Sequence, residues 1–94
     1  MNAVEVIRHQ NAQSLADAVA AQLITRIVET QYSGVRPHIV LTGGGIGTAA
    51  LASIAKGPGL NAVDWELIEI WWGDERYLPS GDPERNESAA RAAL

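Results

Sequence analysis

The sequence contains no cysteine and only two histidines among its 94 residues. A chain without cysteine has no disulfide framework, and it offers no thiolate as a nucleophile or as a metal ligand. Two isolated histidines do not supply the ligand set of a zinc site. We therefore expect no metal centre and no disulfide-stabilised fold.

Basic residues and long apolar runs are also scarce. Seven Lys and Arg stand against eleven Asp and Glu, which gives a net charge of −4 and argues against nucleic acid as a partner. No apolar run approaches the roughly 20 residues needed to cross a bilayer, and the first residues lack the pattern of a signal peptide. We expect a soluble cytoplasmic protein with no membrane partner.

Phenylalanine is absent, and alanine makes up much of the 47% of residues that are hydrophobic. Alanine contributes little buried area, so the core should be thin for an α/β layer structure of this length. The length allows one small domain. We expect residues 1–94 to be an incomplete part of a larger α/β domain, or a chain that covers its apolar surface against a partner.

Apolar spacing and turn signals predict three strands that alternate with three helices. β-Branched or nearly continuous apolar runs indicate strands, and a stripe with a spacing of four from Leu15 to Ile27 indicates the longest helix. Asn11 and Ser14 are its candidate N-caps, and Asn86 is the candidate cap of the last helix. The expected strands are 3–8, 38–42 and 65–72, and the expected helices are 14–32, 48–56 and 87–94.

The resulting β-α-β-α-β-α order predicts a Rossmann-like parallel sheet with right-handed crossovers. The first strand should lie near an edge, and the other two should be buried on both faces. Trp71 and Trp72 should then point to opposite faces, and either tryptophan is an alternative wall for a ligand site. An uncovered edge of this sheet would promote self-association.

Four glycines lie among the five residues 43–47, directly after the second strand. The stretch matches neither a Walker A loop nor G-x-G-x-x-G. Glycines allow the backbone N–H groups to approach a ligand, and a helix N-terminus adds unpaired donors and partial positive charge. This combination predicts a phosphate site, whereas the alternative is a tight turn that needs small residues for packing.

Three charged residues, Asp74, Glu75 and Arg76, follow the third strand and Gly73. Open α/β sheets place ligands at the carboxyl ends of their strands, so this turn and the glycine loop should share one edge. Arg76 suits bidentate contact with phosphate or carboxylate, and the pair of turns fits a small phosphorylated metabolite. The alternative is a solvated loop in which Arg76 pairs with Asp74 or Glu75. The sequence does not decide which carboxylate faces the ligand.

Neither histidine is placed for catalysis. His38 enters its strand at the end opposite the ligand edge, so we expect a structural role. His9 follows the first strand with no partner nearby in sequence, and we expect it on the surface.

Two blocks of the chain resemble one family. Residues 72–77, Trp-Gly-Asp-Glu-Arg-Tyr, followed by Pro79, Asp82 and Asn86, are similar to the G-D-E-R signature of 6-phosphogluconolactonases. Residues 41–45, Leu-Thr-Gly-Gly-Gly, resemble the glycine loop of that family and occur in the same order. The resemblance covers nearly all of this chain but only the N-terminal part of a family member. The later G-x-x-x-D-G-H-T-A-S block of the family has no counterpart here.

The resemblance implies the three-layer α/β/α fold shared with glucosamine-6-phosphate deaminases and ribose-5-phosphate isomerases. It implies hydrolysis of 6-phospho-D-glucono-1,5-lactone to 6-phosphogluconate in the oxidative pentose phosphate pathway, without metal or cofactor. Asp74 would lie beside the substrate, and Arg76 would contact phosphate or stabilise the oxyanion. The residues that would line the substrate site are Thr42, Gly43, Gly44 and Gly45.

The resemblance also places the general base outside this chain. The base of the family is the histidine of the later block, and neither His9 nor His38 matches it, so we expect these 94 residues alone to be inactive. Two alternatives remain. One is a sugar-phosphate isomerase or deaminase of the same superfamily. The presence of Arg76 after Asp74 and Glu75 favours the lactonase over this alternative. The other is a non-catalytic module for phosphate-ligand binding or assembly.

Overall fold

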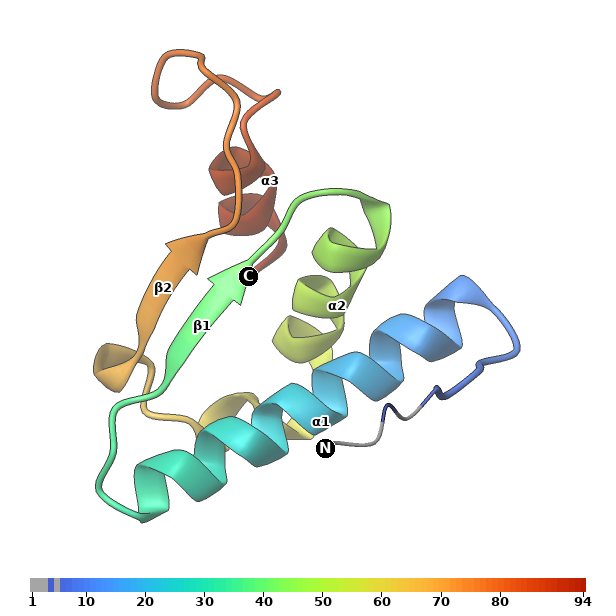
Figure 1. Ribbon diagram of the computed structural model, residues 1–94, viewed down its shortest axis with the longest axis vertical. Coiled ribbons are helices and arrows are strands. Elements are labelled where there is room, and N and C mark those ends of the chain that lie inside the picture. Colours follow the sequence, from blue (N-terminus) through green and yellow to red (C-terminus); the bar gives the residue numbers. More distant parts are fainter. Residues whose placement is uncertain (1–3, 5) are drawn as a thin grey trace.

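The computed structural model describes residue 4 and residues 6–94, among which it has three α-helices, two strands and two short 3₁₀ helices (Figure 1). Their order along the chain is α1 (Ala12–Tyr32), β1 (His38–Leu41), α2 (Gly45–Lys56), η1 (Pro58–Ala62), η2 (Trp65–Leu67), β2 (Glu69–Trp72) and α3 (Asn86–Ala93).

The two strands pair in parallel, with a register that runs from His38 opposite Glu69 to Leu41 opposite Trp72. Figure 1 shows both arrows pointing the same way, with α2 connecting the end of β1 to the segment before β2. The predicted α/β class and the parallel direction of these strands are confirmed.

All three helices contribute to one face of the sheet. Side chains of Leu41 and Trp72 line an apolar cavity of about 460 Å³ together with residues of α1, α2 and α3. The opposite face is exposed, with 68% of Val40 and 55% of Trp71 accessible to solvent. The prediction that the strands are buried on both faces is wrong for the described residues, because no described element covers this second face. A third layer therefore stays a prediction.

Helix α1 ends at Tyr32 as the sequence predicts, but it begins at Ala12, two residues before the predicted start. The Asn11 side chain accepts a hydrogen bond from the Ser14 amide at 2.8 Å, so Asn11 is the N-cap and Ser14 is not. Ser33 is the C-cap, and Gly34 follows it with a φ of 83°. The Ser53 hydroxyl donates to Asp17 at 2.8 Å and ties α2 to α1.

The core between the helices is as thin as the alanine content predicts. Its central cluster is Ala20, Leu51 and Ile54, against which Leu41 and Ala90 pack. Small side chains let α1 and α2 approach closely but bury little area. The cavity beneath the sheet is consistent with this shortage of apolar volume.

The first predicted strand, 3–8, is not formed by the residues that the structure describes. Ala3 and Glu5 lie outside the described residues. Val4, Val6 and Ile7 have no regular structure, and Val4 and Val6 are 89% and 76% exposed. A strand needs a neighbour for its backbone hydrogen bonds, and the described sheet pairs only β1 with β2.

The last strand is shorter than predicted, because Trp65–Leu67 forms η2 rather than extended chain. The Asp64 carboxylate accepts a hydrogen bond from the Glu66 amide, which starts this helical turn. Gln31 of α1 then fixes the segment by accepting from the Asp64 amide and by donating to the carbonyls of Asp64 and Leu67. The Trp65 indole donates to the Leu60 carbonyl at 2.8 Å.

Within the part of the chain that the structure describes, no helix combines the length and the apolar character needed to cross a membrane.

Candidate functional site

The glycine loop and the charged turn leave the same edge of the sheet. Leu41 and Trp72 are register partners at the carboxyl ends of β1 and β2, and the Gly73 amide donates to the Leu41 carbonyl at 3.0 Å. Figure 1 shows both connections starting from the arrowheads of the two strands. The two predicted turns are therefore neighbours, as parallel pairing requires.

Helix α2 begins three residues earlier than predicted, so Gly45, Ile46 and Gly47 form its first turn. Gly44 is the N-cap with a φ of 92°, a backbone conformation that favours glycine. The first intrahelical bond runs from the Thr48 amide to the Gly44 carbonyl at 3.1 Å. The prediction of a loop failed because glycine has poor helix propensity, which the apolar packing of this helix overrides.

The N-terminus of α2 differs from those of the other two α-helices. Asn11 caps α1, and the Glu75 carboxylate accepts from the first amides of α3. No side chain of the described residues caps α2. The amides of its first turn are therefore available to an anion, and helix geometry points them out of the helix end.

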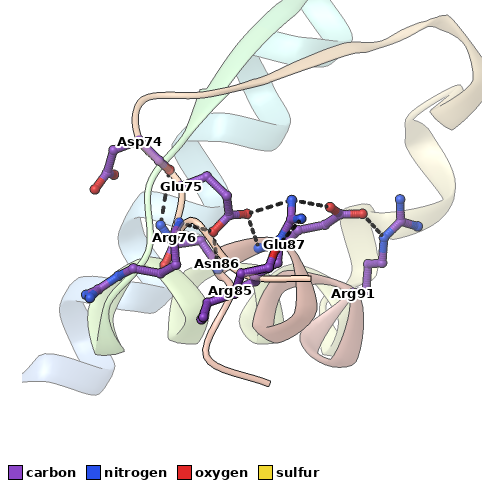
Figure 2. A network of polar contacts seen from close by, with 8 residues as sticks. Asp74, Glu75, Arg76, Arg85, Asn86, Glu87 and Arg91 are labelled. Carbon is purple, nitrogen blue, oxygen red and sulfur yellow. Dashed lines mark hydrogen bonds and ion pairs between the residues drawn. The ribbon is translucent and has the colours of Figure 1, made fainter. Parts of the chain in front are cut away.

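The partly buried Glu75 side chain points toward the start of α3 and holds it (Figure 2). One carboxylate oxygen accepts from the Asn86 amide at 2.7 Å and from the Arg76 amide at 2.9 Å. The other accepts from the Glu87 amide at 3.0 Å and lies 3.6 Å from the Arg85 guanidinium. With both oxygens used in this way, Glu75 stabilises the helix and is not oriented toward a ligand.

These contacts determine the pKa of Glu75. Burial of the carboxyl raises its pKa. This effect is outweighed by hydrogen bonds from the backbone amides of Arg76, Glu87 and Asn86 and by the charge of Arg85, so the pKa of Glu75 lies below its ordinary value. Arg85 also pairs with Glu87 at 3.2 Å, and Glu87 accepts from Arg91 at 2.8 Å. Figure 2 shows this network as a row along the first turns of α3.

Asp74 and Arg76 project on the side opposite to that network. Both residues are exposed, and neither side chain has a hydrogen bond or ion pair to any described residue. Figure 2 shows their ends free of the dashed lines that join the other labelled side chains. The alternative in which Arg76 pairs with a neighbouring carboxylate is therefore not observed, because Arg85 takes that place beside Glu75.

Asn86 joins the two turns, which the sequence did not reveal. It is the first residue of α3 rather than the N-cap, which is Arg85. Its side-chain amide donates to the Asp74 carbonyl at 3.2 Å. The same side chain lies against Gly43, where a β-carbon would come within 2.5 Å of Asn86 Cγ. The only advance signal was that Asn86 belongs to the block that carries the family resemblance.

The histidines lie where the sequence predicts, and His9 is exposed. His38 is at the start of β1, and its Nδ1 atom lies 3.3 Å from the donating indole nitrogen of Trp71. The two rings are stacked with their centroids 6.4 Å apart. Trp71 is on the exposed face of the sheet and Trp72 lines the cavity on the other, so the predicted alternation is confirmed.

The ligand edge is distinct from the apolar cavity beneath the sheet. Neither the glycine loop nor Asp74 or Arg76 lines that cavity. Among the described residues, no three acidic or histidine side chains are grouped as metal ligands. Within residues 4 and 6–94, the edge instead offers uncapped amides together with the Arg76 guanidinium and the Asp74 carboxylate, which have no side-chain partner there. Such groups are suited to a small anionic ligand that carries hydroxyl groups.

A parallel α/β sheet with uncapped amides and charged side chains at one edge defines a broad class of proteins, and comparison with known proteins narrows that class. Residues 10–94 match the family model of glucosamine-6-phosphate isomerases/6-phosphogluconolactonase. The chain belongs to this family, and the resemblance recognised in its two blocks is confirmed.

Named relatives are similar along most of the chain. It is 47% identical over 90 residues to the 6-phosphogluconolactonase of Streptomyces coelicolor, covering 96% of this chain and 34% of the relative. It is 37% identical over 84 residues to the 6-phosphogluconolactonase of Mycobacterium leprae, covering 89% of this chain and 33% of the relative. The chain thus spans about a third of the length of these relatives.

Solved structures agree on the fold. The crystal structure of the devB protein superposes with a TM-score of 0.72 at 34% identity, over 84% of this chain and 33% of the other. A protein from Neisseria gonorrhoeae gives a TM-score of 0.71 at 22% identity, over 92% of this chain and 36% of the other, and supports the fold alone.

Proposed function

We propose that this chain supplies the phosphosugar-binding edge of a 6-phosphogluconolactonase, which hydrolyses 6-phospho-D-glucono-1,5-lactone to 6-phosphogluconate. The names of the relatives and the family match support the reaction. Because the chain spans about a third of those relatives, the activity is proposed for the longest natural polypeptide that contains this sequence.

One observation carries the assignment of the site. The α2 N-terminus, uncapped by any described side chain, adjoins a turn whose Arg76 side chain is unpaired among the described residues. Amides and a guanidinium are complementary to phosphate and to the oxyanion of an ester-like transition state. Thr42, Gly43, Gly44 and Gly45 would line this site, and Asp74 would lie at its rim.

The reaction divides into two steps. A water molecule attacks the lactone carbonyl while a general base takes its proton, which forms a tetrahedral oxyanion. Collapse of that intermediate breaks the bond between the carbonyl carbon and the ring oxygen, and the ring oxygen gains a proton. Arg76 and the α2 amides would bind phosphate or stabilise the oxyanion, and the loss of one oxyanion donor typically lowers kcat by about 10²–10³.

The general base is not assigned to any residue of this chain. Glu75 is unsuited because amides and Arg85 hold its pKa low. His38 is bound to Trp71 at the far end of β1. By the family resemblance, a histidine of the later block would serve. The expected cytoplasmic location and self-association through an uncovered sheet edge both remain predictions.

The test is a hydrolysis assay with the longest natural polypeptide that contains this sequence. We expect 6-phosphogluconolactone to open well above its spontaneous rate, with 6-phosphogluconate as the product. Turnover of glucosamine-6-phosphate in place of the lactone would favour the isomerase or deaminase alternative. Binding of 6-phosphogluconate without any turnover would favour the non-catalytic module.

A further inference from the structure

We infer that Asn86 is a positioning residue that fixes the gap between the glycine loop and the turn carrying Asp74 and Arg76. This inference rests on the proposed function, because it concerns how the proposed site is assembled. Asn86 itself comes from α3 and lies between the two turns as a wedge.

The first part of the argument concerns Gly43. Gly44 has the positive φ of the loop, whereas Gly43 does not, so backbone conformation does not require glycine at position 43. The space around it does, because a β-carbon would lie 2.5 Å from Cγ and 2.9 Å from Nδ2 of Asn86 and would overlap its Oδ1 atom. An alanine here would have to displace the end of the Asn86 side chain, which the hydrogen bond to the Asp74 carbonyl holds in place.

The second part concerns the other side of the wedge. Asn86 Nδ2 donates to the Asp74 carbonyl at 3.2 Å, and the Asn86 amide donates to Glu75 at 2.7 Å. Asp74 and Arg76 have no side-chain bond to the described residues that could hold them in place. Their positions thus depend on the main chain, which is held by Asn86, by Glu75 and by the Leu78 amide, the last of which donates to the Arg76 carbonyl at 2.8 Å. Asn86 also lies against Gly43 of the glycine loop.

It follows that Gly43 and Asn86 act as a matched pair. A methyl group at position 43 would push the Asn86 side chain away. The gap between the glycine loop and the turn carrying Asp74 and Arg76 would then widen by less than about 1 Å, the displacement at which catalysis is strongly affected. Removal of the Asn86 side chain would free that space, so the same methyl group would then be tolerated. A glycine retained only for ligand access would show no such dependence.

The experiment is a double-mutant cycle with Gly43→Ala and Asn86→Ala in the longest natural polypeptide. We expect Gly43→Ala to lower kcat/KM by roughly 10-fold or more, but by less than the 10²-fold that a misplacement of 1 Å can cost, because the shift is smaller. We expect Asn86→Ala to lower it by roughly 3–10-fold, the scale of one lost hydrogen bond. In the Asn86→Ala background, Gly43→Ala should then lower it by less than about 3-fold.

Two controls accompany the cycle. Gly73→Ala places a methyl group in ordinary contact distance, 3.7 Å from the Leu41 carbonyl, and should be additive with Asn86→Ala. Ser88→Ala changes α3 without touching the wedge. Each variant is compared at a temperature where circular dichroism shows it folded, so that loss of activity reports geometry and not unfolding.

Urea unfolding and 6-phosphogluconate affinity of the same variants separate this inference from the proposed function. If the wild-type protein does not hydrolyse the lactone, the proposed function fails, and the same cycle measured on 6-phosphogluconate affinity decides the positioning role, with additive affinities overturning it. If hydrolysis is found but both cycles are additive, the positioning role is overturned. Coupling in unfolding without coupling in kcat/KM would likewise overturn it, because the pair would then be structural only.

Discussion

The most direct test of the proposed anion site compares the stability and ligand affinity of the Gly45→Ala and Gly44→Ala variants. The two glycines are adjacent at the start of α2, and an added β-carbon would meet nothing within 4 Å at either position. They differ in backbone conformation, because only Gly44 has a positive φ, of 92°. The pair therefore separates a requirement of the fold from a requirement of the ligand.

The stability effects should have opposite signs. Gly44→Ala places a β-carbon in a conformation that costs about 1–3 kcal/mol for a residue other than glycine. Gly45 lies in the first helical turn with an ordinary φ, so Gly45→Ala should stabilise the fold by about 0.4–1 kcal/mol through the unfolded chain. Urea unfolding of the two variants measures both values.

The Gly45→Ala substitution should weaken ligand binding although it stabilises the fold. If the phosphosugar lies against the first turn of α2, the methyl group of Gly45→Ala occupies ligand space and blocks access to the amides. We expect 6-phosphogluconate affinity, measured by calorimetry, to fall at least about tenfold, or 1.4 kcal/mol, in this more stable variant. Unchanged affinity in a stabilised Gly45→Ala protein would show that the glycine serves the fold only, and the proposed anion site would be refuted.

Three further predictions follow from the same edge. Arg76→Lys keeps the charge but loses the planar fork, so the barrier for lactone hydrolysis should rise by about 1.5–3 kcal/mol, and wild-type kinetics would indicate a surface loop. Because the folded pKa of Glu75 lies below its ordinary value of 4.5, its stabilisation is present above pH 4.5 and is lost as pH falls through the folded pKa. The stability difference between wild type and Glu75→Gln, from urea unfolding, should thus be larger at pH 7 than at pH 3, and a pH-independent difference would contradict this. The 94-residue chain alone should not open the lactone above the spontaneous rate, since general-base catalysis worth about 10²–10⁴-fold has no assigned residue in it, and robust turnover by the purified chain would disprove this.

Local signals predicted those features that depend on neighbouring residues. The cap at Asn11, the end of α1 at Tyr32 and the end of α2 at Lys56 were all visible as short patterns. The meeting of the two turns at one edge followed from parallel topology, which the order of elements implied. These features need no knowledge of distant side chains.

Features that depend on distant contacts could not be predicted. Residues 65–67 read as strand because they are largely apolar, yet Gln31, more than 30 residues away in sequence, holds them as η2. Glu75 caps α3 by accepting from the Asn86 amide, which lies 11 residues later in the sequence. The segment 3–8 has the composition of a strand, but composition does not supply the pairing partner that a strand requires.

The charged turn shows why a run of similar residues can conceal different roles. Successive side chains of an extended segment point in opposite directions, so Glu75 turns inward while Asp74 and Arg76 turn outward. The inward carboxylate meets amides and Arg85, which keep it ionised and fixed. The outward pair stays free of protein partners among the described residues and is held only through its backbone. One carboxylate of the motif thus builds the turn, and the other is exposed beside Arg76, where the proposed function places the ligand.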